Sequence, residues 1–324
     1  MKNLLSQIIK EELNKVEEHI YQVLEGEQGP LDKIYNHLLR SKGKYLRPVL
    51  FLLSGQFGPK YNSATFIPVA AAMELIHMAT LIHDDVIDLA QVRRGNSTVN
   101  AHFGNMMAVL TGDCLFARAF LLLAEQEKSY LPKTMAQAVV AICSGETEQI
   151  INAYNVGQRE ADYLKRVERK TASFLAASCY LGGMMSESPE TFSKDLEEYG
   201  FNLGMAFQIS DDFLDLVGHQ EKLGKTLGSD LRQGIMTLPI IYALEHSPRK
   251  EELKKMLENK QISREDFPQA LDIVTKSGAL GYSQEKAVSY LTKARLALNG
   301  LPETESRSSL ENILEFIENN FSSN

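Results

Sequence analysis

The chain has 324 residues, of which 44% are hydrophobic, and its formal net charge is −8. This length allows one large domain or two of ordinary size. The acidic balance argues against a general nucleic-acid binder, so we expect no nucleic-acid partner. The three cysteines, Cys114, Cys143 and Cys179, are far apart, and none has the spacing of a metal-ligand pair. This usage favours reduced thiols and a cytoplasmic protein.

The first 24 residues predict an amphipathic helix and not a signal peptide. Apolar residues recur there at intervals of three and four: Leu5, Ile9, Leu13, Val16, Ile20 and Val23. Lys10, Glu11 and Glu12 interrupt any apolar region of the kind that a signal peptide needs. No stretch of the chain reaches the roughly 18 uninterrupted apolar residues of a membrane span. We therefore expect no transmembrane segment.

Helix-period segments follow one another along the chain, and sustained strand patterns are nearly absent. Glycine and proline predict loops at 25–33, 41–48, 54–62 and 218–234. One helix is expected to start near Pro68 and to run into an aspartate cluster, which residues 93–98 end. Further helices are expected at 100–129, 133–156, 160–185 and 190–217, with shorter ones after the last loop. The pattern predicts an all-α fold of ten or more helices in a single domain, 1–324.

A pattern of three aspartates occurs twice. The stretch "DDVID" contains Asp84, Asp85 and Asp88, and "DDFLD" contains Asp211, Asp212 and Asp215. On a helix, positions i and i+4 lie on one face, where like charges repel. Repetition inside apolar sequence therefore indicates a bound cation, and all-oxygen ligands favour Mg²⁺ with substrate phosphates. A solvated helix end is the alternative for a single such motif.

Basic and polar residues accompany the aspartates. His77 lies seven residues before the first motif and Gln208 three residues before the second. Lysine and arginine are the usual partners of phosphate oxygens, and they gather in short segments near both motifs: Lys44, Arg47, Arg93, Arg94, Lys170 beside Thr171, and Lys225. Together these residues suggest two phosphorylated substrates, one bound through metal and the other by basic residues alone.

The ordered motifs "GKYLRP", "LIHDDVID…RRG", "RKTA", "FQISDDFLD" and "GKTLGSDL…GIMTLP" resemble those of the trans-isoprenyl diphosphate synthases. The resemblance covers roughly residues 25–245. Within that family, "GETEQI" and "GSDLRQG" are similar to the catalytic subunits of bacterial heptaprenyl synthases. The resemblance implies the isoprenoid synthase fold, with helices around a central active-site cavity. It also implies a prenyltransferase with about three Mg²⁺ ions per active site.

The chemistry implied by the resemblance explains the acidic and basic clusters. An allylic diphosphate, bound through Mg²⁺, ionises to an allylic cation that the double bond of isopentenyl diphosphate attacks. Loss of a proton then gives a product one five-carbon unit longer. The metal cluster and basic residues would stabilise charge on the leaving diphosphate. Successive additions are expected to give a long-chain polyprenyl diphosphate, C30 or longer and C35 in particular, for quinone side chains such as that of menaquinone.

The resemblance also assigns roles to single residues. Asp84, Asp88 and Asp211 would bind Mg²⁺ directly, with Asp215 completing the metal site through water. Asp85 and Asp212 would act through water or through contacts to the ligands. Isopentenyl diphosphate would be bound by Lys44, Arg47, His77 and Arg94. The allylic substrate would be bound by Arg93, Lys170, Thr171, Gln208 and Lys225. One departure is that Ile235 stands where many members have lysine.

The same resemblance implies that residues on the helix face before the first motif limit the length of the product. Ala79 lies five residues before Asp84, and Ile76 and Ala72 precede it by one and two turns. Because none of the three is aromatic, we expect no early block to chain growth. The alternative is that Ala79 simply allows close helix packing.

Other functions remain open. A short-chain farnesyl or geranylgeranyl diphosphate synthase and a terpene cyclase share the fold, although a cyclase would have a different second motif. A non-catalytic subunit would lose the aspartates, and a helical Ca²⁺-binding protein would need a ligand-rich loop. The resemblance further implies a homodimer, or a heterodimer with a small non-catalytic subunit. It also implies a cytoplasmic enzyme, peripheral to the membrane that receives its product.

Overall fold

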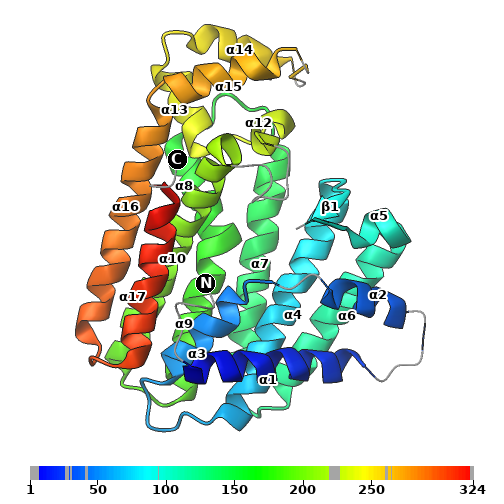
Figure 1. The fold of residues 1–324 in the computed structure, drawn as a ribbon, viewed down its shortest axis with the longest axis vertical. Coiled ribbons are helices and arrows are strands. Elements are labelled where there is room, and N and C mark those ends of the chain that lie inside the picture. The colour runs from blue at the N-terminus through cyan, green and yellow to red at the C-terminus, as the bar shows by residue number, and fades with distance from the viewer. Residues whose placement is uncertain are drawn as a thin grey trace. The chain divides into compact units, whose positions relative to one another are not determined.

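The computed structural model describes residues 7–25, 29, 31–40, 43–93, 95–218, 227–259, 262–263 and 265–321. Helices dominate these residues (Figure 1), which confirms the predicted all-α class. Contacts between Cα atoms divide the chain into two compact units. The first contains residues 1–139, 177–197 and 299–313, and the second contains residues 140–176, 198–298 and 314–324. The assignment of residues 1–324 to a single domain stays a prediction.

The first unit is built around two long helices, α4 (Ser63–Ile87) and α6 (Asn105–Ala124), which pack side by side (Figure 1). Shorter elements pack on them or on one another: α1 (Gln7–Leu24), α2 (Asp32–Leu39), α3 (Leu46–Gly55) and α5 (Val99–Phe103). A two-stranded hairpin, β1 (Val92–Arg93) and β2 (Asn96–Ser97), follows α4. The core of this unit is formed by the apolar faces of these helices, including the continuous buried segment 69–76 of α4.

The second unit contains the elements α8 (Glu160–Val167), a π-helix (Glu168–Ala172), α12 (Ser229–Gln233), α13 (Leu238–His246), α14 (Lys250–Glu258), α15 (Phe267–Lys276) and α16 (Ala279–Ala297). The short helix α13 packs against α8, α14, α15 and α16. Among the helices that the structure describes, four contribute residues to both units, namely α7 (Tyr130–Ile151), α9 (Ser173–Met185), α10 (Glu190–Val217) and α17 (Glu305–Glu318). Two short 3-10 turns, Leu298–Gly300 and Asn319–Phe321, follow α16 and α17.

Several element boundaries differ from the sequence predictions. Helix α4 begins at Ser63 and not near Pro68, because the Asn62 side chain accepts a hydrogen bond from the Ala64 N–H (3.0 Å) and caps the helix. The helix expected at 100–129 is two helices, separated by Gly104, whose φ of 85° breaks the helical path. The segment expected to be one helix at 160–185 is α8, the π-helix and α9. The loop expected at 218–234 includes α12.

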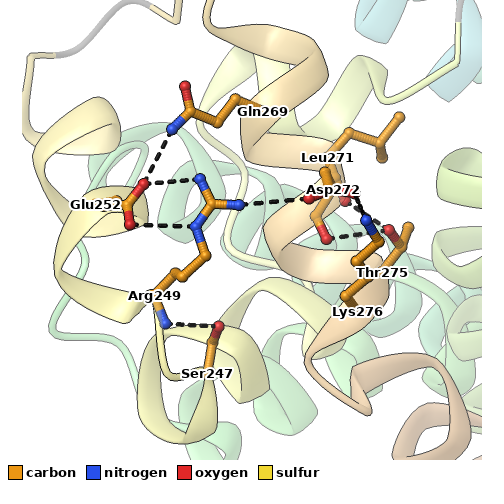
Figure 2. A network of polar contacts seen from close by, with 8 residues as sticks. All are labelled: Ser247, Arg249, Glu252, Gln269, Leu271, Asp272, Thr275 and Lys276. Atoms are coloured by element: carbon orange, nitrogen blue, oxygen red, sulfur yellow. Dashed lines mark hydrogen bonds and ion pairs between the residues drawn. The ribbon is translucent and has the colours of Figure 1, made fainter.

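A polar network holds the corner between α13, α14 and α15 (Figure 2). Arg249 donates two hydrogen bonds to Glu252 (Nε to Oε1, 3.1 Å; Nη2 to Oε2, 2.8 Å) and one to Asp272 (3.4 Å). Gln269 donates to Glu252 at 2.9 Å, and Lys276 pairs with Asp272 at 2.6 Å. These side chains are half-exposed, so each ion pair contributes little stability alone. The network links the start of α14 to α15.

Helices α4 and α6 are long and apolar enough to cross a membrane by length and composition. In the most apolar 18-residue stretch of each helix, 61% of α4 is buried and 39% of α6. The core helices of soluble proteins have the same length and composition, so this is weak evidence for a membrane span. The expected absence of a transmembrane segment stays a prediction.

Candidate active site

The first aspartate motif lies at the C-terminal end of α4, in the first unit. Asp84 is half-buried, Asp85 is 5% exposed, and Asp88 is exposed at the C-cap of the helix. The helix ends there because Leu89 adopts a left-handed conformation with φ of 52°. The two outer aspartates of the motif are therefore more exposed than the middle one.

Asp85 is held by residues that follow it in the sequence. Arg93 donates from Nε to the Asp85 Oδ1 atom at 2.8 Å, and Arg93 Nη2 forms an ion pair with the same atom, also at 2.8 Å. Asn100 donates from Nδ2 to the Asp85 backbone carbonyl (3.1 Å) and to that of Ala90 (3.0 Å), and Thr98 donates to the same Ala90 carbonyl at 2.7 Å. These bonds tie the end of α4 to the hairpin and to α5. Arg93, predicted to bind the allylic substrate, is paired with Asp85 in this structure.

A cavity of about 80 Å³ lies beside this motif in the first unit. Its lining joins the "GKYLRP" turn, α4 and the hairpin, and it includes Gly43, Tyr45, Glu74, Asp85 and Arg93. The turn is shaped by Tyr45, whose φ of 52° is costly for an aromatic residue. Strained backbone of this kind clusters at functional sites.

The predicted diphosphate-binding residues Lys44, Arg47 and His77 belong to the same part of the unit. Lys44 is exposed in the turn, Arg47 is in the first turn of α3, and His77 is half-buried on α4. Burial lowers the pKa of Arg47 to about 10, and the negative charge of Glu74 opposes that shift. Arg47 therefore remains a cation at neutral pH, with Glu74 as its nearby counter-charge.

The second motif lies near the C-terminal end of α10, in the second unit. Asp211 is exposed, Asp212 is 6% exposed, and Asp215 is half-buried. Asp212 accepts a hydrogen bond from the Tyr163 hydroxyl (2.6 Å) and another from Gln208 Nε2 (2.8 Å). Burial raises the pKa of Asp212 to about 6, although both hydrogen bonds and the charge of Arg166 act in the opposite direction. As in the first motif, the middle aspartate faces the protein.

Asp215 holds the start of the next helix. Its Oδ1 atom accepts the N–H of Ser229 at 3.2 Å, and its Oδ2 atom accepts the N–H of Asp230 at 3.1 Å. Its backbone carbonyl accepts the N–H of Gly228 at 2.7 Å. Both carboxylate oxygens of Asp215 therefore contact the N-terminal end of α12. This arrangement fits a role through water better than direct ligation of a metal.

The "RKTA" segment forms the π-helix of the second unit. Lys170 pairs with Glu146 of α7 and lies 3.4 Å from Gln149 Oε1, and Thr171 donates to Gln208 Oε1 at 2.7 Å. Two glycines allow neighbouring helices to approach this segment. A Cβ atom on Gly145 would lie 3.1 Å from the Lys170 backbone nitrogen, and one on Gly204 would lie 2.5 Å from the Ala172 Cα. Single π turns within helices are frequent at functional sites.

Comparison with known proteins shows to which family the chain belongs. The family model described as polyprenyl synthetase matches residues 28–274. The chain belongs to the polyprenyl synthetase family. It is 40% identical to heptaprenyl diphosphate synthase component 2 of Geobacillus stearothermophilus, over 95% of this chain and 96% of that protein. The corresponding component 2 of Bacillus subtilis is 38% identical over 95% of this chain and 88% of that protein.

A solved structure of a polyprenyl synthase from Caulobacter crescentus, complexed with calcium and isoprenyl diphosphate, is similar in fold. Its TM-score is 0.92 at 33% identity, and the match covers 98% of this chain and 97% of that one. The activity of this polyprenyl synthetase is that of a polyprenyl diphosphate synthase, a prenyltransferase. The isoprenoid synthase fold predicted from the motifs is thereby confirmed.

The residues of this polyprenyl synthetase fit a metal that arrives with a diphosphate. Each motif offers hard oxygen donors that are exposed or half-buried, namely Asp84 and Asp88 in the first unit and Asp211 in the second. Among the residues that the structure describes, no group of three or more His, Cys, Asp or Glu side chains could hold a metal ion by itself. Mg²⁺ usually takes one or two carboxylates and completes its shell with phosphates and water. The donors of each motif therefore suit a hard divalent cation with diphosphate better than a metal held by protein alone.

The structure does not show a role for the other residues predicted from the sequence. Arg94 and Lys225 lie outside the described residues. Ala72, Ile76 and Ala79 are fully buried in α4, and none of them lines the cavity described above. Ile235, at the position where the resemblance implies a lysine in many members, donates its backbone N–H to the Asp230 carbonyl at 2.9 Å. The roles predicted for these residues stay predictions.

Sequence reasoning missed the residues that hold the site in place, including Tyr163, Arg166, Asn100 and Glu146. Each is a buried polar residue, and burial is not legible from residue type alone. The partners through which they hold these positions lie on other segments, so local spacing in the sequence does not mark them.

Proposed function

We propose that the chain condenses an allylic diphosphate, such as farnesyl diphosphate, with successive isopentenyl diphosphate units. The product we propose is a long-chain all-trans polyprenyl diphosphate, with heptaprenyl diphosphate as the main species, for a quinone side chain. The observation that carries this proposal is the shared design of the two motifs, in which the middle aspartate is buried and an outer one exposed. The relatives named heptaprenyl diphosphate synthase component 2 support the chain length.

In this proposal Mg²⁺, when bound, would neutralise the diphosphate and stabilise the charge that develops as it leaves. Asp84, Asp88 and Asp211 would hold the metal, and Asp215 would contact it through water. Lys170 would offer its cation to the allylic diphosphate, with Glu146 and Gln149 fixing its position. No protein nucleophile is required, and we assign no general base.

Incubation with Mg²⁺, farnesyl diphosphate and labelled isopentenyl diphosphate tests the proposal. We expect the label to enter a longer prenyl diphosphate and to stay in isopentenyl diphosphate when EDTA removes the metal. Cyclic hydrocarbons formed from the allylic substrate alone would show a terpene cyclase instead. No conversion, with every candidate partner subunit present, would refute the proposed reaction.

The partner is part of the same proposal. The relatives' designation as component 2 supports a second, small non-catalytic subunit, and a homodimer is the alternative. Comparing turnover with and without candidate small subunits decides between these states. We also propose a cytoplasmic location at the membrane surface, because the product is strongly apolar.

Replacing Lys44 or Arg47 with alanine should mainly raise the KM for isopentenyl diphosphate. These side chains are assigned to the diphosphate that is bound without metal, where cations contribute most. Loss of one such contact should raise that KM by about tenfold or more. Steady-state kinetics with each substrate varied measures the effect, and Lys60→Ala, which removes an exposed cation of the same unit, is the control. A change confined to the KM for the allylic substrate would refute the assignment.

Replacing Ala79 with phenylalanine should shorten the product to C15–C20. The added ring would narrow the path on the α4 face that leads away from the first motif, where the prenyl tail is proposed to grow. Each added isoprene buries apolar carbon worth roughly 0.8 kcal/mol per CH₂ group, so a shorter path stops growth early. Chromatography of the dephosphorylated products measures chain length.

Ala79 is fully buried, so its replacement also overpacks the core and lowers stability. The melting temperature of the variant must therefore be measured before its products are interpreted. Ala64→Phe, at an exposed position on the same helix, is the matched control and should leave chain length unchanged. A folded Ala79→Phe variant with the wild-type product length would remove Ala79 from the chain-length determinants.

A further inference from the structure

The middle aspartates of the two motifs are both buried, but they are held by different chemistry. Asp85 is paired with the cation of Arg93. Asp212 accepts side-chain hydrogen bonds from two neutral groups, the hydroxyl of Tyr163 and the amide of Gln208. A buried carboxylate without such donors is strongly unfavourable. The orientation of Asp212 therefore depends directly on these two donors.

Tyr163 is placed to orient Asp212 and not to touch substrate. It lies on α8, its side chain is only 1% exposed, and its hydroxyl donates to Asp212 Oδ2 at 2.6 Å. Its ring packs against the guanidinium of Arg166, whose Cζ atom is 5.6 Å from the ring centre. Arg166 is itself fixed by Gln158 Oε1 (2.8 Å) and by the backbone carbonyl of Met236 (2.6 Å). Tyr163 is thus part of a rigid, buried support.

The other oxygen of Asp212 connects the motif to the π-helix. Thr171 donates to Gln208 Oε1 at 2.7 Å, and Gln208 donates in turn to Asp212 Oδ1 at 2.8 Å. The continuous series Thr171–Gln208–Asp212–Tyr163 therefore links the π-helix, α10 and α8. Because adjacent residues on a helix point in different directions, fixing Asp212 on the inner face also fixes Asp211 on the outer face.

We propose that Tyr163 is a positioning residue of the second aspartate motif, which holds Asp212 so that Asp211 faces the metal with its diphosphate. This rests on the proposed function, in which Asp211 binds Mg²⁺. Residues that orient metal ligands through hydrogen bonds typically change metal affinity or activity by 10-fold to 100-fold when they are lost. If the Tyr163 hydroxyl is removed, Gln208 still donates to Asp212 Oδ1, but Asp212 Oδ2 loses its hydrogen bond from Tyr163.

The Tyr163→Phe variant tests this proposal, since it removes one oxygen atom and keeps the ring that packs against Arg166. We expect it to weaken binding of Mn²⁺ in the presence of inorganic diphosphate by about tenfold. Electron paramagnetic resonance of free Mn²⁺ measures this directly, without turnover. In the condensation assay the Mg²⁺ concentration for half-maximal rate should rise by a similar factor. Unchanged Mn²⁺ binding in the folded variant would overturn the proposal.

A matched control separates positioning from a general loss of stability. Tyr282→Phe removes a hydroxyl that donates to Glu160 at 2.5 Å, in the same unit, and should leave Mn²⁺ binding unchanged. Equal weakening in both variants would show a general structural effect and would overturn the specific role of Tyr163. Thermal unfolding of each variant confirms that both are folded at the assay temperature.

A double-mutant cycle shows whether Tyr163 acts through Asp212. In an Asp212→Asn background, Tyr163→Phe should change Mn²⁺ binding by much less than it does in the wild type. Additive effects, in which Tyr163→Phe weakens Mn²⁺ binding equally with and without the Asp212 change, would overturn the proposal. Because Mn²⁺ binding is measured without turnover, a wild-type chain that binds Mn²⁺ and diphosphate but condenses nothing with every candidate partner subunit present would refute the proposed function and still test Tyr163.

Discussion

Asp84→Ala and Asp211→Ala should each abolish Mg²⁺-dependent condensation. Each change removes an oxygen ligand from the site where charge develops on the leaving diphosphate. Loss of one charge-stabilising contact costs on the order of 10²–10³ in rate, and loss of a metal ligand should cost at least as much. The two residues belong to different units, so a comparable loss in both variants would show that both motifs serve one reaction.

The isosteric variants Asp84→Asn and Asp211→Asn separate charge from fold. They keep the size of the side chain, so a loss of turnover without a loss of melting temperature points to the missing charge. Asp113→Ala, at a 64% exposed side chain on α6, is the control and should retain wild-type turnover. Near-wild-type turnover in either alanine variant would contradict the two-motif account of metal binding.

Gly204→Ala should lower both stability and turnover. The new Cβ atom would lie 2.5 Å from the Ala172 Cα and 3.1 Å from its Cβ, so α10 and the π-helix must move apart. Overpacking of this kind costs about 1–3 kcal/mol in the free energy of unfolding. The movement would also displace Thr171, which donates to Gln208, and Lys170 beside it. We therefore expect a lower kcat together with a lower melting temperature.

Gly281→Ala is the matched control for that substitution. Gly281 lies near the start of α16 in the same unit, and a Cβ atom there would have no neighbour within 4 Å. Replacing glycine with alanine in a helix gains about 0.5–1 kcal/mol when nothing opposes it. We expect a small rise in melting temperature and unchanged turnover. A Gly204→Ala variant as stable and as active as this control would contradict the close packing on the π-helix.

The fold could be predicted where periodicity is long and uninterrupted. Helix α10 spans Glu190–Val217, the range expected from its apolar period. Prediction failed where a local event overrides periodicity. The Asn62 cap starts α4 five residues before Pro68, and Gly104 with its positive φ divides α5 from α6. The π-helix could not be foreseen, because a segment of five residues is too short to show a period of its own in the sequence.

The candidate site could be predicted only in its composition. The two aspartate triplets and the basic segments were visible because charges inside apolar sequence are costly. Which aspartate of each triplet is buried depends on the rotation of the helix against its neighbours, and the sequence does not state this. The partners of Asp85 and Asp212 come from segments eight and forty-nine residues away, namely Arg93 and Tyr163. Such contacts are set by tertiary packing and not by local spacing.

The chain length of the product tests the central claim most directly. The chain is incubated with Mg²⁺, farnesyl diphosphate and excess isopentenyl diphosphate, alone and with candidate small subunits. The products are then dephosphorylated and their masses measured. We predict all-trans products of C30 or longer, with C35 as the main species. A main product of C20 or shorter under all of these conditions would contradict a long-chain polyprenyl diphosphate synthase.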